Sequence, residues 1–318
     1  MAVGRHGTGR HGVGASGVQV HLRHQGHHAV IVAVSGGVRE YEVAGRRLLD
    51  GYGEQEMCSG ARGQLLIPWP NRLRDGSYDF GGVRHQVPLS EPEKLNAIHG
   101  FLRWESWEVA EQSEDRVVME HTLYPRAGYP FTLRVAVAYQ VSGSGLAARV
   151  TATNIGAQPC PYGMGTHPYL RVDAEPLELQ WLEAPGAIRL LEDERAIPVG
   201  REPVAGTVYD FRTSTRILAT QLDTAFTNLR RDEQGLAWVR LWRGNGEHGV
   251  GLWMDQAFPF YMLYTGDTLA DPARRRRSLG VEPMTCAPNA FASGDGLIAL
   301  APGESTVASW GVTTLAAR

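Results

Sequence analysis

The strongest constraint on the fold is a hydrophobic period of two residues in the segment FTLRVAVAYQV, residues 131–141. Its large apolar side chains fall on one face, at Phe131, Leu133, Val135, Val137, Tyr139 and Val141. Thr132, Arg134 and Gln140 fall on the other face, as in a strand with one buried side. The same alternation continues in LAARVTATN, residues 146–154, after the turn sequence SGSG. Two alternating runs joined by such a turn predict a β-hairpin.

Five more segments have the composition of strands, and no window of fifteen residues predicts an amphipathic helix. These segments are RVVMEHTLY, AWVRLWRG, GVGLWMD, FYMLYTG and STVASWGV. With 38 Gly and 18 Pro in 318 residues, turn formers are abundant. The sequence therefore predicts an all-β protein, a large antiparallel β-sandwich. We expect residues 18–318 to form one domain, since no linker divides them.

Residues 1–17, MAVGRHGTGRHGVGASG, have no apolar periodicity and are rich in Gly and His. Such a segment cannot bury enough surface to offset its chain entropy, so we expect a disordered tail. Its histidines offer weak metal ligands, but a solvated tail is the simpler interpretation.

Composition argues against several classes of partner. The formal net charge is -3, which favours neither nucleic acid nor an anionic membrane. The longest early apolar run, AVIVAV, is too short to span a bilayer. The three cysteines, Cys58, Cys160 and Cys286, are widely spaced and form no CxxC pair, which indicates a reducing compartment. These features predict a cytoplasmic protein. The GxGxxG spacing occurs only in GTGRHG, GVGASG and GNGEHG, none of which lies between a predicted strand and a helix as a nucleotide site requires, and there is no P-loop pattern.

The residues that could carry out chemistry lie in separate short segments, each flanked by turn residues. Asn71 and Arg72 follow the rigid PWP segment in IPWPNRLRDGSYDFGG, where an arginine could present its donors to sugar hydroxyls or a carboxylate. The alternative is an ordinary surface arginine. His99 lies in LNAIHGF and His167 in GTHPYL, and each could be catalytic or merely structural.

Two carboxylates complete the set. Asp223 lies in the apolar and Thr-rich segment LDTAFTNL, and Glu282 lies between Val281 and Pro283 in VEPMTCAPNAF. Burial of Glu282 would raise its pKa towards that of a useful base. Either acid could instead be a surface or capping carboxylate.

Taken in order along the chain, these segments resemble the motifs of the aldose 1-epimerase family, the galactose mutarotases. The matching steps are Asn71-Arg72, Gly76-x-Tyr78-x-Phe80, Val87-Pro88, Asn96-x-x-His99-Gly100, His167-Pro168-Tyr169, Leu222-Asp223-x-x-Phe226 and Glu282. The resemblance covers most of the chain after residue 18. It departs from the best-known pattern after the glutamate, where Pro283 stands in place of Thr. This departure bears on the sugar more than on the chemistry.

The resemblance implies an enzyme that interconverts the α and β anomers of a free aldose without a cofactor. It assigns His167 as the acid, Glu282 as the base and His99 as an assisting donor. Asn71, Arg72 and Asp223 would bind the hydroxyls of a monosaccharide. Ring opening needs one proton delivered to the ring oxygen and one removed from the C1 hydroxyl, so one acid and one base on opposite sides suffice.

Other interpretations stay open at this point. A glycosidase would need two carboxylates flanking a bond, whereas this set pairs a carboxylate with histidine. Metal binding by His99 and His167 lacks a third ligand of suitable spacing in the sequence. A sugar-binding or regulatory module of the same fold would need no acid–base pair. The four arginines at 274–277 are either a solvated surface or a site for an anionic sugar, such as a phosphate or sulfonate.

Overall fold

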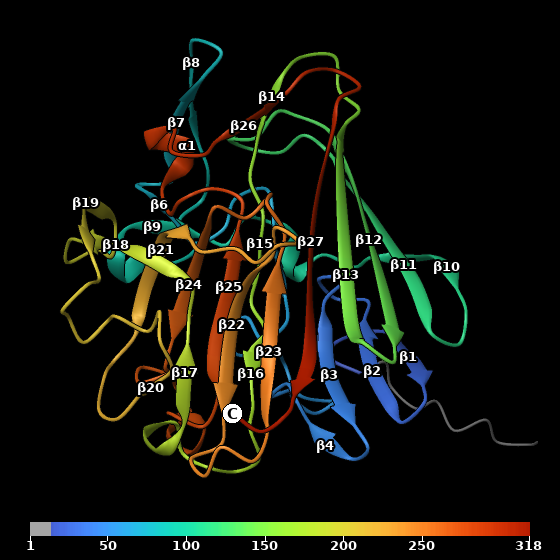
Figure 1. Ribbon diagram of the computed structural model, residues 1–318. Coiled ribbons are helices and arrows are strands. Elements are labelled where there is room, and N and C mark those ends of the chain that lie inside the picture. Colours follow the sequence, from blue (N-terminus) through green and yellow to red (C-terminus); the bar gives the residue numbers. More distant parts are fainter. Residues whose placement is uncertain (1–13) are drawn as a thin grey trace, which may run out of the picture.

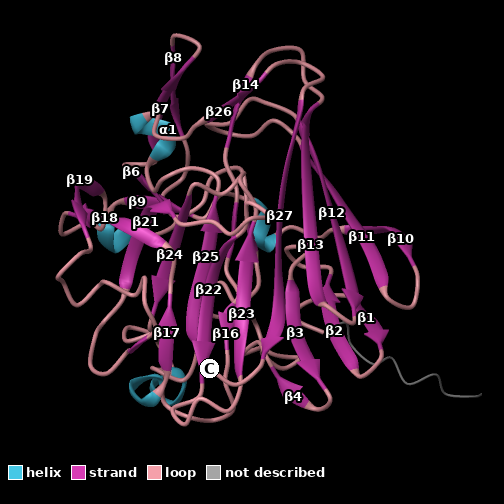
Figure 2. Cartoon of the chain, in the orientation of Figure 1, coloured by secondary structure: helices cyan, strands magenta, loops and turns pink. Residues whose placement is uncertain are grey.

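The structure, a computed structural model, describes residues 14–318 and is built almost entirely of antiparallel strands (Figures 1 and 2). This confirms the predicted all-β class. The few helices are single turns at the ends of loops: η1 Pro92–Lys94, η2 Leu102–Trp104, η3 Leu177–Leu179, η4 Pro272–Arg274 and α1 Ala290–Ser293. None of the described helices is long and apolar enough to cross a bilayer.

The largest sheet has nine strands and contains the predicted hairpin. In spatial order its strands are β10 Glu108–Gln112, β11 Arg116–Leu123, β12 Leu133–Ser142, β13 Gly145–Asn154, β27 Ser305–Leu315, β23 Gly249–Met254, β22 Ala237–Trp242, β17 Trp181–Glu183 and β20 Thr215–Arg216. Along β12 the residues alternate between buried and more exposed, as the period of two predicts. Ser142 pairs with Gly145 across the turn, so the predicted hairpin is confirmed.

A second sheet carries the strands that matter for function. Its order is β19 Pro198–Pro203, β18 Gly186–Glu192, β21 Asp223–Leu229, β24 Phe260–Tyr264, β25 Leu279–Met284, β15 Gly165–Thr166 and β5 Leu65–Leu66, with β16 Tyr169–Leu170 also paired to β25. One face of this sheet joins the same hydrophobic core as the nine-stranded sheet, through Phe226, Tyr261, Leu263, Leu279 and Val281. The two sheets therefore form the layers of a β-sandwich.

A third sheet packs against β11 and β12, in the other half of the nine-stranded sheet (Figure 1). Its strands are β1 Gln19–His24, β2 His27–Val32, β3 Val38–Val43 and β4 Arg46–Arg47. Three two-stranded ladders complete the fold: β6 Arg72–Arg74 with β9 Asn96–Ile98, β7 Ser77–Phe80 with β8 Val83–Gln86, and β14 Cys160–Tyr162 with β26 Ile298–Leu300.

Of the predicted tail, residues 1–13 lie outside the described residues. Residues 14–17 form a turn, in which the Gly17 N–H donates to the Gly14 carbonyl over 2.9 Å. Ser16 is buried and its carbonyl accepts from Val34. These four residues therefore pack on the folded domain. The three cysteines are all buried and free.

Candidate active site

Strand register places the candidate carboxylates on the outer face of the second sheet, away from the sandwich core. Glu282 pairs with Met262 and Asp223 pairs with Tyr264, so these four side chains share one face. Val281, the residue before Glu282, points the other way into the core. Loops that precede β5 and follow β9 cover this face, and together they enclose a cavity of about 330 Å³.

His167 lies directly opposite Glu282 on the neighbouring strands. The residues on both sides of His167 pair with β25 in one continuous register. Pro168, which lacks an N–H, interrupts the ladder but still accepts a hydrogen bond from Val281 through its carbonyl. As a result His167 Nε2 and Glu282 Oε1 are 3.2 Å apart. The predicted acid and base are thus in direct contact, instead of facing each other across an open gap.

Burial makes this pair electrically neutral. His167 is 5% exposed and Glu282 is 3% exposed. Burial, followed by the charge of Arg62, lowers the pKa of His167 to about 3. Burial, followed by the charge of Asp223, raises the pKa of Glu282 to about 8. Near pH 7 the pair therefore holds one proton, which lies mainly on Glu282 and can transfer to His167 across the hydrogen bond.

Each member of the pair also has one buried polar atom that forms no hydrogen bond with residues 14–318. These atoms are His167 Nδ1 and Glu282 Oε2. Buried polar atoms are seldom left unpaired in a folded protein unless a ligand or water completes them. Their position beside the cavity indicates that a bound polar molecule would complete them.

His99 is held as a neutral hydrogen-bond donor. Its Nδ1 accepts the backbone N–H of Asn71 over 3.1 Å, so the ring proton must lie on Nε2. Burial lowers the pKa of His99 well below its ordinary value, and the nearby His167 lowers it further. The ring centroids of His99 and His167 are 5.7 Å apart.

The His-Gly sequence has a backbone reason. His99 adopts φ 64° and the next residue, Gly100, also adopts φ 64°. A Cβ on Gly100 would lie 2.1 Å from the carbonyl oxygen of Ile67, so only glycine fits. This close approach turns the chain at the end of β9 and leaves His99 against the cavity.

Asn71 and Arg72 line the cavity, but both are already engaged with protein groups. The Asn71 amide donates to the sulfur of Met262, and its side-chain oxygen accepts the N–H of Arg72. The Arg72 guanidinium forms a two-pronged pair with Glu91, with Nε–Oε2 and Nη2–Oε1 distances of 2.9 Å. The geometry thus shows Asn71 fixing His99, and Arg72 offering its remaining donors.

Asp223 remains accessible to solvent in the cavity although protein surrounds it closely. The partial loss of water raises the pKa of its carboxyl group, and the charge of Arg72 opposes this effect. No hydrogen bond or ion pair to its carboxylate occurs in the described part of the chain. Its oxygens are free to accept hydrogen bonds from a ligand.

The cavity also contains residues that the sequence analysis did not select. Arg103, Trp104 and Tyr264 line it together with the six predicted residues. Trp104 is 44% exposed, an unusual state for such a large apolar side chain. For Arg103 and Trp104 the only sequence signal was their place just after the His-Gly step, in HGFLRW, and Tyr264 lies in the predicted strand FYMLYTG.

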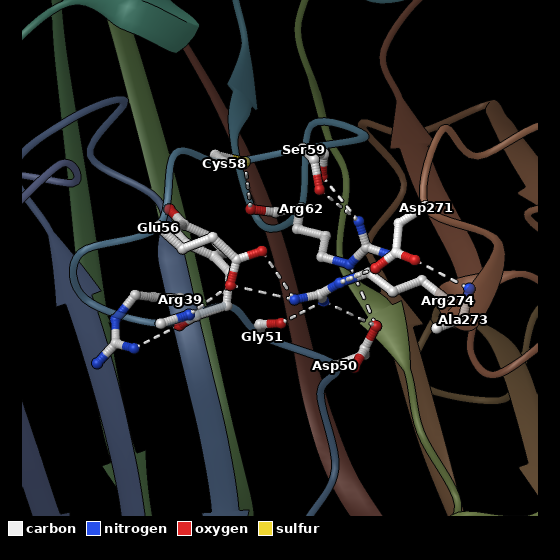
Figure 3. A network of polar contacts seen from close by, with 12 residues as sticks. Arg39, Asp50, Gly51, Glu56, Cys58, Ser59, Arg62, Asp271, Ala273 and Arg274 are labelled. Carbon is white, nitrogen blue, oxygen red and sulfur yellow. Dashed lines mark hydrogen bonds and ion pairs between the residues drawn. The ribbon is translucent and has the colours of Figure 1, made fainter.

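A stack of three planar groups supports His167 from behind. The Tyr169 ring lies parallel to the His167 ring, with centroids 4.9 Å apart and an interplanar angle of 8°. The guanidinium of Arg62 lies 4.4 Å from the Tyr169 ring centroid. Asp50 accepts from Arg62 Nε over 3.1 Å and neutralises its charge (Figure 3). The stack restricts the rotation of the histidine ring.

The arginine run 274–277 does not line this cavity. Arg274 binds Glu56 and the carbonyl of Gly51 (Figure 3), and Arg276 binds Glu178 and Asp267. Arg277 lines a separate surface hollow of about 540 Å³. The run therefore lies outside the cavity and serves mainly to anchor loops.

His99, His167 and Glu282 each offer one ligand atom, and these atoms lie within 4.8 Å of one another. Glu282 is the third ligand that spacing in the sequence did not show. By geometry alone the three side chains could also hold a metal ion. The described residues thus bring all six predicted positions to one cavity and add a metal-like cluster at its centre.

Comparison with known proteins identifies the family. The profile of the family described as aldose 1-epimerase matches residues 18–312. The chain belongs to the aldose 1-epimerase family. This confirms the resemblance drawn from the sequence motifs.

Relatives of this aldose 1-epimerase family member cover nearly the whole chain. The protein YihR of Escherichia coli K12 is 33% identical over 294 residues, which is 91% of this chain and 90% of YihR. Among solved structures, an aldose epimerase homologue from C. elegans superposes with a TM-score of 0.84 at 18% identity, covering 95% of this chain and 99% of that one. A galactose 1-epimerase from Lactobacillus acidophilus NCFM gives a TM-score of 0.79 at 19% identity, covering 94% and 95%. These structures confirm the galactose mutarotase-like sandwich.

Proposed function

We propose that this protein is an aldose 1-epimerase that interconverts the α and β anomers of a free aldose by acid–base ring opening and closure. The observation that carries the proposal is the buried pair of His167 and Glu282, which shares one proton at the wall of a polar cavity. A pair that can hold its proton on either member suits a reaction that needs an acid and a base at once.

In the proposed mechanism, Glu282 accepts the proton of the C1 hydroxyl while His167 Nε2 donates a proton to the ring oxygen. The bond between C1 and the ring oxygen breaks, and C1 becomes an aldehyde. Rotation about the C1–C2 bond and the reverse proton transfers close the ring with the other configuration. The two protons are exchanged and no cofactor is consumed.

These roles require the carboxylate–imidazolium form of the pair, whereas burial favours the neutral form. The two forms differ by one proton transfer across the 3.2 Å contact. A C1 hydroxyl that donates to Glu282 stabilises the carboxylate and so favours the charged form. The entering sugar must also replace the contact between His167 Nε2 and Glu282, since both atoms then bind the substrate.

The other cavity residues have supporting roles in this proposal. His99 donates its Nε2 proton towards the ring oxygen and assists His167. Asp223 accepts hydrogen bonds from sugar hydroxyls, and Arg72 donates to them with the N–H groups that Glu91 leaves free. Asn71 acts on the sugar through His99, whose ring it orients.

The test is anomer exchange of freshly dissolved α-glucose or α-galactose, followed by polarimetry or by exchange NMR of the anomeric proton. Glu282→Gln keeps the shape but removes the base, so the catalysed rate should fall by at least ~10²-fold. Glu194→Gln is the matched control, because Glu194 is exposed and lies outside the cavity. Exchange by Glu282→Gln at the rate of the control would refute the assignment. A wild-type protein that binds sugars without exchanging them would instead be a sugar-binding module.

A further inference from the structure

Only one ring nitrogen of His167 is held by a protein group within residues 14–318. Its Nε2 lies 3.2 Å from Glu282 Oε1, whereas its Nδ1 has no hydrogen-bond partner there. In most catalytic histidines the nitrogen that does not react is oriented by a carboxylate or a backbone carbonyl. In the proposed mechanism the sugar also replaces the contact with Glu282. Some other contact must then keep the histidine ring in its orientation.

The ring of His167 is in flat contact with Tyr169. The two rings are parallel within 8°, with their centroids 4.9 Å apart. A histidine that rotated about its Cβ–Cγ bond would lose this parallel contact. Tyr169 is itself buried, and its hydroxyl donates to the Gly60 carbonyl over 2.9 Å. The orientation of the histidine ring therefore depends on that of the tyrosine ring.

The Tyr169 ring is in turn in contact with Arg62. The guanidinium carbon of Arg62 lies 4.4 Å from the centroid of that ring, and the arginine is only 2% exposed. Arg62 Nη1 donates to the Ser59 carbonyl over 2.8 Å, and its Nε donates to Asp50 over 3.1 Å (Figure 3). A buried guanidinium that is held at two nitrogens presents a fixed flat surface to the tyrosine.

Asp50 connects this stack to the strands beside the acid–base pair. Besides Arg62, its carboxylate accepts from Arg171 over 3.3 Å and from Ser278 over 3.1 Å. Arg171 directly follows β16, which begins shortly after the proposed acid, and Ser278 directly precedes β25, which contains the proposed base. One carboxylate outside the cavity thus joins the ends of two strands that position the pair.

We propose that Arg62 and Asp50 are positioning residues, which hold the ring of His167 through the intervening tyrosine so that Nε2 faces the reacting oxygen of the sugar. This role rests on the proposed function, in which His167 is the acid. Neither Arg62 nor Asp50 lines the cavity, so we expect neither to touch the sugar. Loss of the stack should therefore lower kcat and leave KM nearly unchanged, unlike the loss of a residue that binds the sugar.

The experiment measures kcat and KM for anomer exchange of glucose and of galactose. Arg62→Met removes the guanidinium, keeps a side chain of similar length and leaves Asp50 its other partners. Its kcat should fall by about 10- to 100-fold, the size of loss that a misplaced catalytic group causes, with KM within about 2-fold of the wild type. Tyr169→Leu should show the same pattern. Tyr169→Phe keeps the flat ring, so its kcat should exceed that of Tyr169→Leu by about 10-fold.

A double variant tests whether Arg62 acts through the tyrosine. If it does, Arg62→Met in the Tyr169→Leu background should add little to the loss of kcat, because the two changes remove one shared contact. Arg276→Met is the matched control, since Arg276 also binds two acids outside the cavity, and its kcat should be that of the wild type. Where Arg62→Met does not fold, Arg62→Lys keeps a charge beside Asp50 without the flat group, and it should show the same loss.

Three results would overturn the inference while the epimerase proposal stands. One is an unchanged kcat in Arg62→Met, whether or not KM rises. Another is an equal loss of kcat in Arg276→Met, which would indicate a general effect of removing a loop anchor. The third is a double variant whose loss is the product of the two single losses, which would mean that Arg62 acts independently of Tyr169.

If neither sugar exchanges in the wild type, the epimerase proposal fails, and crystal structures of the variants decide this one. A His167 ring that is rotated in Arg62→Met and in Tyr169→Leu, but not in Arg276→Met, would support it. A ring that keeps its orientation in the first two variants would overturn it.

Discussion

Replacing Glu282 by Gln should make the protein more stable at alkaline pH, and the gain should disappear in acid. The reason is that burial and the charge of Asp223 raise the pKa of Glu282 from its ordinary value of 4.5 to about 8. Below pH 4.5 the carboxyl group is protonated in both the folded and the unfolded chain, so it adds no pH dependence. Between pH 4.5 and 8 the unfolded chain releases the proton while the folded chain keeps it. Stability therefore falls as the pH rises through this window.

The size of the effect follows from the two pKa values. A difference from 4.5 to about 8 corresponds to roughly 5 kcal/mol of folding free energy lost above pH 8, taking 1.36 kcal/mol per pKa unit. Gln cannot ionise and escapes this cost. With roughly 2 °C of Tm per kcal/mol in a domain of this size, the mutant should gain up to about 10 °C on the wild type between pH 5 and pH 9.

The assay is thermal unfolding followed by the fluorescence of the 8 tryptophans at closely spaced pH values, with Glu194→Gln as the control. Any constant loss from the substitution cancels, because the prediction concerns how the difference between mutant and wild type changes with pH. His167 contributes in the opposite direction, since its pKa is lowered to about 3 and stability falls as the pH drops from 6.5 towards 3. Its contribution lies mostly below pH 6.5. Parallel Tm curves for mutant and wild type from pH 5 to 9 would show that Glu282 is not held protonated by burial.

Two further predictions concern the other cavity residues. His167→Asn should abolish most anomer exchange. His99→Asn should lower the exchange rate less, because water can replace an assisting donor. NMR exchange rates measure both, and a larger loss in His99→Asn would show that the two histidines have each other's role. Asn tolerates the positive φ at residue 99, so the fold should survive. Asp223→Ala and Arg72→Ala should each weaken sugar binding by ~1.5–3 kcal/mol in calorimetric titration. Arg72→Ala should also lower the Tm, because it leaves the buried Glu91 carboxylate without its arginine partner. Unchanged sugar affinity in both variants would show that the sugar binds elsewhere.

The sequence alone was sufficient for the fold class and for several local features. The alternation in residues 131–154 predicted the β12–β13 hairpin because one face of each strand is buried and the other is not. The pairs Asp75-Gly76 and Gly81-Gly82 are turn sequences; they flank β7, and all four residues have positive φ. Such features depend on neighbours in the chain, so the chain itself reports them.

The partners within the site could not be predicted in the same way. Two such contacts are the ion pair of Arg72 with Glu91 and the hydrogen bond from the Asn71 N–H to His99. Both depend on loops that meet only in the folded protein. Periodicity carries no information about such contacts. For the arginine run the sequence left a solvated surface and an anion site open, and only the structure shows that Arg274 and Arg276 form ion pairs that anchor loops.

Glu282 shows why a conflict between a residue and its setting is the most informative signal in this chain. All six residues of β25, LGVEPM, are buried, so the strand is apolar on both faces except at this one carboxylate. Stability alone would favour an apolar residue there, because a carboxyl group with a pKa near 8 destabilises the fold at neutral and alkaline pH. The same burial lets Glu282 share a proton with His167, which a solvated carboxylate would not do. The feature that makes the strand less stable is therefore the feature that would make it a catalyst, and the pH-dependent gain in stability of Glu282→Gln measures that conflict directly.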